Sequence, residues 1–379
     1  MITKKSIATA AHVHQFGERL YCEFFEDIID LCIDALDHIH VEYSVYYTQR
    51  FDHNFMDRLG RDKNKIVLIF KNDHDYDDLN ETAVPKVELL TDKKIVFFSP
   101  IPNLKTNLSN LKIVYWGGDV LTQRDQYASL TPEKTKNFNT GQHWISLTYR
   151  NRIHRILTAL FLIGRDLDQF GKLRISRAGT ANLKSWQEIC KFEISPDFLS
   201  KYNDTMSTGL WHFNNLRHGG QPFGNLFAQL RGLDNAGNFD THLRKLYRNS
   251  FVEIVNETLF IKDVLISEKF KNSVYGFNLP IIISSVGYVQ HLREIGFDMF
   301  DDVINHDYDT VQDPLMRIAT AIIDNERLLK DAEFAKKVWS NCYTRLEQNY
   351  MFDRYSFADF CKTNCMDEFN KIVQEFLIS

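Results

Sequence analysis

The chain has 379 residues, of which 44% are hydrophobic and 25% are charged. These proportions are ordinary for a globular protein, and they exclude collagen-like, low-complexity and largely disordered classes. The formal net charge of −5 provides no overall positive field. Any site for nucleic acid or another polyanion must therefore be a local basic patch. At about 150 residues per domain, the length predicts two domains.

The six cysteines show neither a CxxC pair nor a zinc-ligand spacing. Cys361 and Cys365 lie four residues apart on a predicted helix, and we expect buried reduced thiols there rather than a two-ligand metal site. The segment after Met1 lacks the apolar run of a signal peptide, and no stretch approaches about 18 consecutive apolar residues. We therefore expect a cytoplasmic protein without a membrane span.

The first third of the chain contains four short runs of β-branched and aromatic residues, separated by polar stretches. Apolar residues also recur at helical spacing between Ile28 and Leu36. Strands that are apolar throughout and alternate with helices indicate a parallel sheet covered on both faces. The four predicted strands are Val41–Tyr47, Lys65–Phe70, Lys94–Ser99 and Lys112–Trp116.

A second series of strands and helices follows the polar stretch Thr131–Gln142, which is typical of a linker. Residues 196–240 are rich in Gly, Asn and Asp and are predicted to form loops. The series consists of strands at His143–Thr148, Lys172–Ser176, Phe251–Asn256 and Leu279–Ser284, and of helices at Ile153–Ile163, Ser267–Tyr275, Gly287–Ile295 and onward from Pro314.

These patterns predict two α/β domains and a helical C-terminal tail. The first domain is predicted to cover residues 1–140 and the second residues 141–345. The tail covers residues 346–379 and could pack back on the first domain.

The strongest local signal is the basic run Arg150–Arg155, which follows a predicted strand and opens a predicted helix. At this point of an α/β sheet, free N–H groups and the helix dipole bind anions. Arg150, Arg152 and Arg155 oppose that dipole, so they destabilise the helix unless an anion is their partner. We favour an anion site here over a solvated basic face that contacts the acidic N-terminal third.

A second signal is the sequence Ser267-Glu268-Lys269 at another predicted helix start. Ser267 is a suitable N-cap, and Lys269 in the first turn can bind a phosphate as a point charge. The Glu268 carboxylate can accept two ribose hydroxyls, so the pair suits a nucleoside diphosphate, although an ordinary surface charge pair has the same sequence. Glu257, which follows the strand 251–256, can contact a bound sugar or serve as a loop cap.

Possible metal ligands are few. The run Asp73–Asp78 contains Asp-x-Asp pairs of the kind that hold a divalent cation in some sugar transferases, but its Lys, Asn and Glu neighbours favour a solvated acidic loop. The pairs His12/His14 and His38/His40 lack a third ligand nearby, so we expect no metal. The chain has no phosphate-loop, G-x-G-x-x-G or G-x-S-x-G motif, which leaves NTPase, standard dinucleotide and α/β-hydrolase functions without support.

Two groups of motifs point to a family. In the first group, a strand is followed by Arg152, His154 and Arg155 in an Arg-x-His-Arg pattern, and Thr148 stands where Asn is usual. The second group is, in order, Glu257-Thr258, Ser267-Glu268-Lys269, Leu279-Pro280, Leu292–Phe300 and Tyr308-Asp309. Together they span residues 143–177 and 251–318 and resemble bacteriophage and bacterial glycosyltransferases related to the α-1,3-fucosyltransferases.

The resemblance implies a GT-B fold, in which two doubly wound Rossmann-like domains face a cleft and the nucleotide sugar lies mainly on the second domain. It assigns Glu268 and Lys269 to the donor ribose and phosphate, and Arg152 or Arg155 to the diphosphate. Leu265 occupies the position of a fucosyltransferase Tyr. GT-B enzymes mostly stabilise the leaving diphosphate with cations and helix dipoles, so we expect a UDP- or GDP-linked sugar donor and no metal.

The expected activity is therefore transfer of a sugar from a nucleotide sugar to an acceptor hydroxyl. The fucosyltransferase relatives are inverting, and inversion requires a carboxylate base to deprotonate the acceptor. That base should come from the N-terminal domain. Asp119, which follows the flexible pair Gly117-Gly118, is the first choice, and Asp73 is the second.

The acceptor follows from a narrower resemblance, because phage members of this type add sugars such as arabinose to hydroxymethylcytosine in DNA. Double-stranded DNA as acceptor requires a basic cleft and aromatic side chains that hold a flipped base. Trp211, Arg217 and His218 are the candidate acceptor-binding residues. The alternatives are a glycosyltransferase with a glycan, lipid-linked or protein acceptor, and a non-catalytic binding protein with a GT-B-like shell.

Overall fold

The computed structural model divides the chain into two compact units, residues 1–129 with 354–379, and residues 130–353. The predicted boundaries, residues 140 and 345, differ from these positions, because residues 131–137 belong to the second unit and one helix runs through residue 345. Each unit is described by itself. The residues described are 41–46, 66–71, 94–99, 101–102, 109–115, 131–137, 142–148, 152–174, 184–218 and 241–378.

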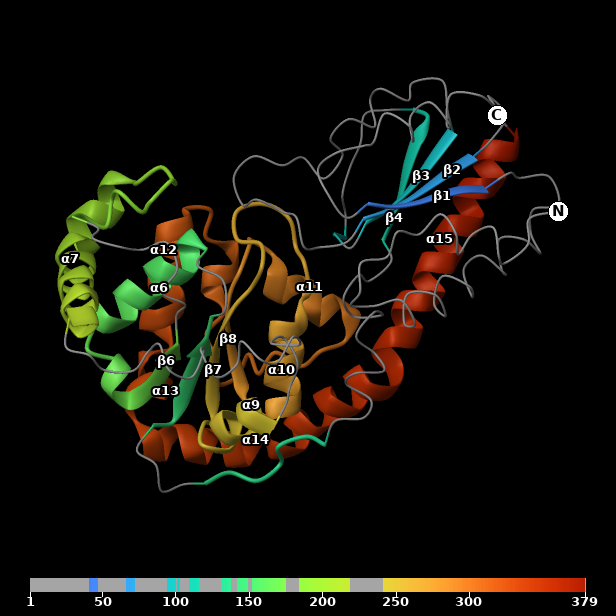
Figure 1. The fold of residues 1–379 in the computed structure, drawn as a ribbon. Coiled ribbons are helices and arrows are strands. Elements are labelled where there is room, and N and C mark those ends of the chain that lie inside the picture. The colour runs from blue at the N-terminus through green and yellow to red at the C-terminus, as the bar shows by residue number, and fades with distance from the viewer. Residues whose placement is uncertain are drawn as a thin grey trace. The chain divides into compact units, whose positions relative to one another are not determined.

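The first unit contains a four-stranded parallel sheet in the order β1-β2-β3-β4 (Figure 1). The helix α15 (Ala358–Ile378) packs against β3 and β4, where the Phe98 and Phe369 ring centroids lie 5.5 Å apart. In addition, the Tyr115 amide donates to the Glu368 carboxylate at 3.2 Å. The strands are β1 (Val41–Tyr46), β2 (Ile66–Lys71), β3 (Lys94–Ser99) and β4 (Leu111–Tyr115).

The second unit contains a parallel sheet in the order β6-β5-β7-β8. The chain forms β5 first, adds β6 on one side of it and then returns to add β7 and β8 on the other side. This reversal creates a switch point between β5 and β7, and doubly wound sheets bind ligands at the carboxyl ends of the strands there. The strands are β5 (Trp144–Leu147), β6 (Gly171–Arg174), β7 (Val252–Asn256) and β8 (Leu279–Ile283).

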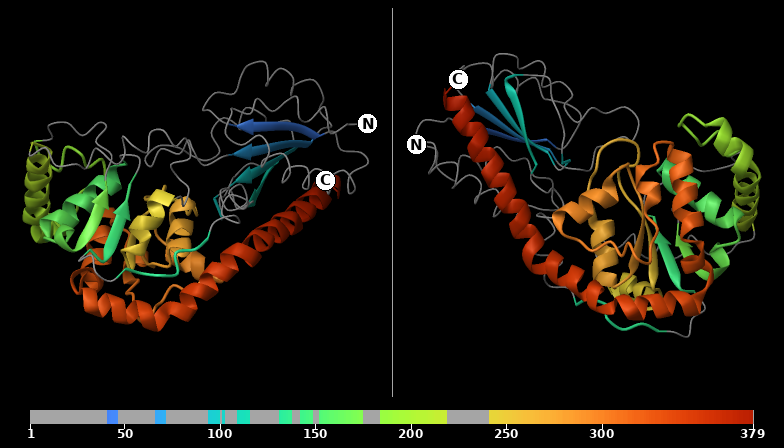
Figure 2. Two further views of the ribbon diagram at one scale, coloured as in Figure 1. Left: turned by 60° about the horizontal axis from the view of Figure 1, so that its bottom comes forward. Right: turned by 180° about the vertical axis from the view of Figure 1, so that it is seen from behind.

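Helices cover both faces of this second sheet (Figures 1 and 2). One layer contains α6 (Ile153–Gly164), α7 (Pro196–His218) and α12 (Pro314–Asp324), and the other contains α9 (Thr241–Arg248), α10 (Glu268–Gly276) and α14 (Ala332–Phe352). Every residue of β7 and β8 is buried as a result. The remaining elements are α11 (Tyr288–Ile295), α13 (Glu326–Lys330), the 3-10 helices η3 (Asp168–Phe170) and η4 (Asp307–Thr310), and the π-helical turn η5 (Asp353–Phe357).

All eight predicted strands are present within two residues of their predicted ends, and the mixed α/β class is confirmed. The helices predicted near Ile153, Ser267 and Gly287 are also present. The apolar stripe Ile28–Leu36 lies outside the described residues. Cys361 and Cys365 are both buried, and neither forms a disulfide bond with a described residue.

The prediction of loops over residues 196–240 was wrong for its first half, where α7 forms. This helix has few apolar residues, and it is held by close packing on α6. A Cβ added to Gly209 would lie 1.9 Å from the Leu160 carbonyl oxygen, and one added to Gly164 would lie 1.9 Å from the Thr205 carbonyl oxygen. Glycine in both helices therefore lets the two backbones approach. In the sequence, the same glycine content is typical of a loop, which is why the helix was not predicted.

The first part of the predicted linker, residues 131–137, is extended and bound to the second unit. The Glu133 amide donates to the Tyr275 carbonyl at 2.8 Å. The Lys136 ammonium donates to the carbonyls of Tyr247 at 2.8 Å and Gly276 at 2.5 Å, and to Asn278 Oδ1 at 2.5 Å. Burial lowers the pKa of Lys136 well below its ordinary value, against the attraction of Glu133 and Glu253.

Candidate active site

The candidate site lies at the switch point, where three segments that are far apart in the sequence meet. One is the start of α6, which follows β5. The second is the turn that follows β7, at Glu257 and Thr258. The third is the start of α10, at Ser267 to Lys269. The amino ends of the helices that follow the strands lie at this edge and present free N–H groups, so the edge suits an anion.

The Arg-x-His-Arg turn is anchored to the end of β7 through one carbonyl group. His154 Nε2 lies 3.0 Å from the Glu257 carbonyl oxygen, and Arg155 Nη2 donates to the same oxygen at 3.0 Å. The His154 ring stacks on Phe260 with centroids 4.8 Å apart. Both His154 and Arg155 are buried. Hydrogen bonds therefore join the Arg-x-His-Arg motif directly to the Glu257 segment.

The Glu257 carboxylate is fully buried, and its hydrogen-bond partners are groups of the protein itself. It accepts hydrogen bonds from the Tyr288 hydroxyl at 2.8 Å, from the Thr258 amide at 3.1 Å, and from the Ser267 hydroxyl. Burial raises the pKa of Glu257, and the nearby Lys269 charge opposes that increase. Of the two roles left open by the sequence, contact with a bound sugar does not fit this burial, whereas the hydrogen bond from the Thr258 amide fits a loop cap. Glu257 also positions the start of α10.

Ser267 is the N-cap of α10, as predicted, because its hydroxyl accepts from the Lys269 amide. The Lys269 ammonium lies 2.6 Å from Glu268 Oε1, 3.1 Å from Thr258 Oγ1 and 3.3 Å from Ser267 Oγ. The side chains of Lys269 and Glu268 are 17% and 22% exposed, so both remain accessible to a ligand.

Two cations flank the Glu268 carboxylate. Burial alone would raise the pKa of Glu268, but the charges of Lys269 and Arg155 outweigh it and lower that pKa. The carboxylate is therefore ionised at neutral pH. Arg155 and Lys269 thus bring two positive charges to this helix start, where the helix dipole also favours an anion.

Two further polar atoms at this edge were missed by sequence reasoning as site candidates. Thr148 Oγ1 follows β5 and Asn256 Oδ1 ends β7, and both are buried without a hydrogen-bond partner among the described residues. The Asn256 amide nitrogen donates to Ser146 Oγ at 2.9 Å, which aligns it between the strands. Buried polar atoms without partners are rare and mark places where a ligand or water binds.

The other candidate residues are distributed as follows. Arg152 is the N-cap of α6 and has an extended backbone, but it makes no side-chain cap hydrogen bond. Trp211 lies on α7 and is 63% exposed. Leu265 is buried and offers no surface for stacking. Asp73, Asp119, Arg150 and the side chains of Arg217 and His218 lie outside the described residues.

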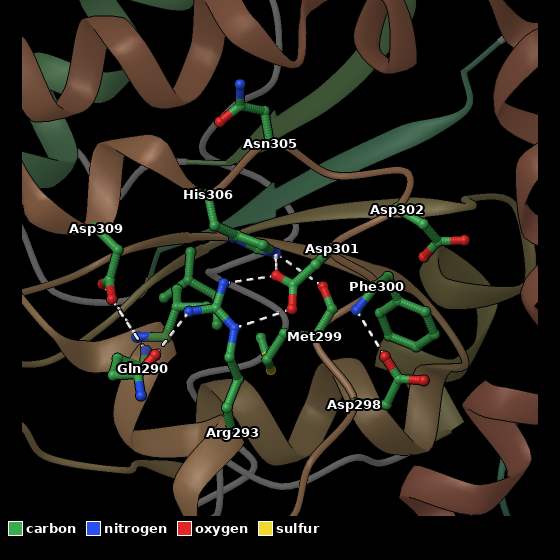
Figure 3. A network of polar contacts seen from close by, with 12 residues as sticks. Gln290, Arg293, Asp298, Met299, Phe300, Asp301, Asp302, Asn305, His306 and Asp309 are labelled. Atoms are coloured by element: carbon green, nitrogen blue, oxygen red, sulfur yellow. Dashed lines mark hydrogen bonds and ion pairs between the residues drawn. The ribbon is translucent and has the colours of Figure 1, made fainter.

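The last motifs of the ordered set, Leu292–Phe300 and Tyr308-Asp309, belong to a polar network of their own (Figure 3). Arg293 of α11 pairs with Asp301, and Asp309 accepts from the Val289 and Gln290 amides at 3.0 Å, so it caps α11 from η4. These charges are paired within the protein, and the motif holds α11 in place. A cavity of about 900 Å³ opens between this helix and residues 301–312.

The neighbouring His306 and Tyr308 complete that support. His306 lies 2.9 Å from the Tyr308 hydroxyl and 2.7 Å from the Met299 carbonyl, and the hydroxyl in turn accepts from the Ile282 amide of β8. Burial lowers the pKa of His306, so the ring is neutral at pH 7. The Tyr-Asp motif therefore connects η4 to the sheet.

Comparison with protein-family models, curated proteins and solved structures found no match to this chain. Within the described part of the chain, no helix is long and apolar enough to cross a membrane. The same residues contain no group of three or more His, Cys, Asp or Glu side chains that could hold a metal ion.

Proposed function

We propose that the protein is a glycosyltransferase that moves a sugar from a nucleoside diphosphate to an acceptor hydroxyl. One observation carries the proposal. The Arg-x-His-Arg turn, the Glu257-Thr258 turn and the Ser267-Glu268-Lys269 helix start meet at the switch point of a doubly wound sheet, joined by hydrogen bonds. The site therefore combines partly exposed and buried cations with a helix start, as a diphosphate requires.

In this proposal, Lys269 and Arg155 neutralise the charge that develops on the departing diphosphate. Preorganised cations in a partly dry site stabilise such charge strongly, because they need no reorganisation during the reaction. Glu268 is ionised and can accept hydrogen bonds from the two ribose hydroxyls. Arg152, at the start of the same turn as Arg155, is a third cation for the diphosphate.

The proposed fold is GT-B. Two parallel four-stranded sheets, one in each unit, support it. The catalytic base would then come from the first unit, and Asp119 and Asp73 remain the candidates. The donor is a UDP- or GDP-linked sugar, and we expect no metal in the reaction.

For the acceptor, we propose 5-hydroxymethylcytosine in duplex DNA, to which arabinose or a similar sugar is added. A flipped base requires an aromatic surface, and the exposed indole of Trp211 supports this. The direct test is incubation of the protein and a panel of donors with hydroxymethylcytosine DNA and with unmodified cytosine DNA. Nucleosides from digested product are then weighed. A gain of one sugar mass only with the hydroxymethylated DNA supports this acceptor.

The donor is tested first by thermal denaturation against UDP-, GDP-, CMP- and dTDP-sugars. A nucleotide that binds only the folded state stabilises it by about 2.7 kcal/mol at a hundredfold excess over Kd. The stabilisation should be lost in Lys269→Met and kept in Lys337→Met, which removes an exposed lysine on α14. Absence of stabilisation by any donor would argue against the glycosyltransferase. Binding of a donor without any mass gain on DNA would favour a glycan acceptor.

A further inference from the structure

A second group of cations lies at the edge of the same sheet, on β6, and takes no part in the site above. Arg174 is the last residue of β6, and it is only 9% exposed. Its Nη1 atom is buried without a hydrogen-bond partner, and no ion pair involves Arg174 among the described residues. A guanidinium in this environment is unusual, because arginine is almost never buried unless it is paired.

Lys172 adds a second positive charge on the same side of the strand. Side chains two residues apart on a strand point to the same face of the sheet. The pKa of Lys172 is lowered, mainly by burial and in addition by the nearby charge of Arg174. Burial also lowers the pKa of Arg174, to about 10. The two cations therefore repel each other in a partly desolvated position, and no carboxylate among the described residues pairs with either.

The strand register places this pair relative to other charges. Lys172 is level with Ile145 of β5, which is level with Glu253 of β7, so Lys172 shares the sheet face covered by α9. Glu253 is the buried carboxylate on that face, and it accepts from the Tyr247 hydroxyl at 2.9 Å. Lys136, not Lys172 or Arg174, is the cation that lowers the pKa of Glu253. Glu253 therefore does not serve as a counter-charge for Lys172 and Arg174.

An unpaired buried charge costs several kcal/mol, so a protein retains one where a ligand of opposite charge completes it. A guanidinium offers a planar pair of donors and an ammonium adds a point charge, a combination that suits the several oxygens of a phosphate group. We propose that Lys172 and Arg174 form a phosphate-binding site at the carboxyl end of β6.

This phosphate site is separate from the proposed donor site. β5 lies between β6 and β7, so the two strand ends are roughly 10 Å apart at the usual spacing of about 4.8 Å per strand. Lys269 lies at the start of α10, and that helix packs on β7 and β8, on the other side of β5 from β6. The phosphate at β6 can belong to a small phosphorylated molecule or to the backbone of a nucleic acid, and the experiment below distinguishes these sources. Its outcome does not depend on sugar transfer.

The test measures phosphate affinity in protein that already carries Lys269→Met, so that the donor site does not compete. Inorganic phosphate is titrated against chloride at constant ionic strength, by calorimetry. We expect addition of Arg174→Met or Lys172→Met to weaken phosphate binding at least tenfold. Addition of Lys337→Met, an exposed lysine on α14, should leave the affinity unchanged. Equal affinity with and without Arg174 would overturn the proposal, as would the absence of phosphate binding after Lys269→Met alone.

A second measurement tests the unpaired state of the guanidinium. Without phosphate, Arg174→Met should melt at the same or a higher temperature than the parent protein, because an apolar side chain replaces a buried unpaired charge. A clear fall in the melting temperature, or failure to fold, would indicate a structural partner and would overturn the proposal. Titration of the same proteins with a nucleoside monophosphate and with a short oligodeoxynucleotide then identifies the source. The ligand whose affinity falls more in Arg174→Met is the source of the bound phosphate.

Discussion

The Tyr288 hydroxyl donates a hydrogen bond to the Glu257 carboxylate at 2.8 Å, and both side chains are fully buried. Tyr288 is the first residue of α11, whereas Glu257 follows β7. Because the same carboxylate also holds Ser267, this contact connects α11 with the start of α10, which carries Lys269. Glu257 and Tyr288 are therefore positioning residues for the candidate site.

Replacement of Tyr288 by Phe should destabilise the protein by about 1–3 kcal/mol, because the ring remains and only the hydrogen bond to a buried carboxylate is lost. The pKa of Glu257 should rise further. Urea denaturation measures the first effect. Tyr355→Phe, in which the parent side chain is 56% exposed, is the matched control and should change stability by less than about 0.5 kcal/mol. Equal stability of the two variants would remove Tyr288 from this network.

Loss of the Lys269 charge should lower the rate of sugar transfer. Removal of one preorganised group that stabilises transition-state charge typically lowers kcat by about 10²–10³-fold. Lys269→Met is expected to fall in this range, while Lys337→Met keeps the parent rate. Steady-state kinetics with the donor identified by thermal denaturation provides the measurement. A folded Lys269→Met protein with near-normal kcat would exclude Lys269 from the mechanism.

Burial of Glu253 should make stability depend on pH. Burial raises the pKa of Glu253 to about 8 from an ordinary value of 4.5. The unfolded chain therefore loses this proton near pH 4.5 and the folded protein only near pH 8. The stability contributed by the protonated carboxyl is complete below about pH 4.5 and is lost as the pH rises to about 8. Each pKa unit corresponds to about 1.4 kcal/mol.

Glu253→Gln should remove most of that pH dependence, because the amide keeps the shape and cannot ionise. Unfolding free energies at pH 5 and pH 8 provide the comparison, and the parent protein should lose more stability over this interval than the variant. Glu193→Gln, at an exposed position, should behave as the parent. Identical pH profiles for the parent and Glu253→Gln would show that Glu253 is ionised in the folded state.

Gly209→Ala should destabilise the packing of α7 on α6. The added Cβ would lie 1.9 Å from the Leu160 carbonyl oxygen, so the helices must separate. Such overpacking costs about 1–3 kcal/mol, which exceeds the gain of roughly 1 kcal/mol in helix propensity. Ser207→Ala, at an exposed position of the same helix, should be neutral or slightly stabilising. Chemical denaturation that ranks Gly209→Ala above the parent would contradict the close approach.

Sugar transfer should persist in excess EDTA, because Lys269 and Arg155 supply the positive charge that a metal would otherwise provide. The measurement is the transfer rate before and after chelation. Loss of activity that Mn²⁺ or Mg²⁺ restores would contradict this expectation. Asp73 and Asp75 would then become candidate metal ligands.

The sequence by itself determined the local elements. Short apolar and aromatic runs predicted every strand among the described residues, since strands of a covered parallel sheet are rich in apolar side chains. Ser267 could be predicted as an N-cap because capping depends on residues two or three positions away. By contrast, α7 was missed, since its stability comes from contact between Gly209 and α6 rather than from an apolar stripe.

Only the tertiary structure decided which residues act together and which are buried. The contact between Arg155 and Glu257 joins positions 102 apart in the sequence, and it exists because strand order brings the ends of β5 and β7 together. The same packing buries the Glu257 carboxylate and leaves Arg174 without a counter-charge from any described residue. Burial and pairing depend on neighbours from distant segments, so the chemical role of a charged side chain is set by the fold and not by its local sequence.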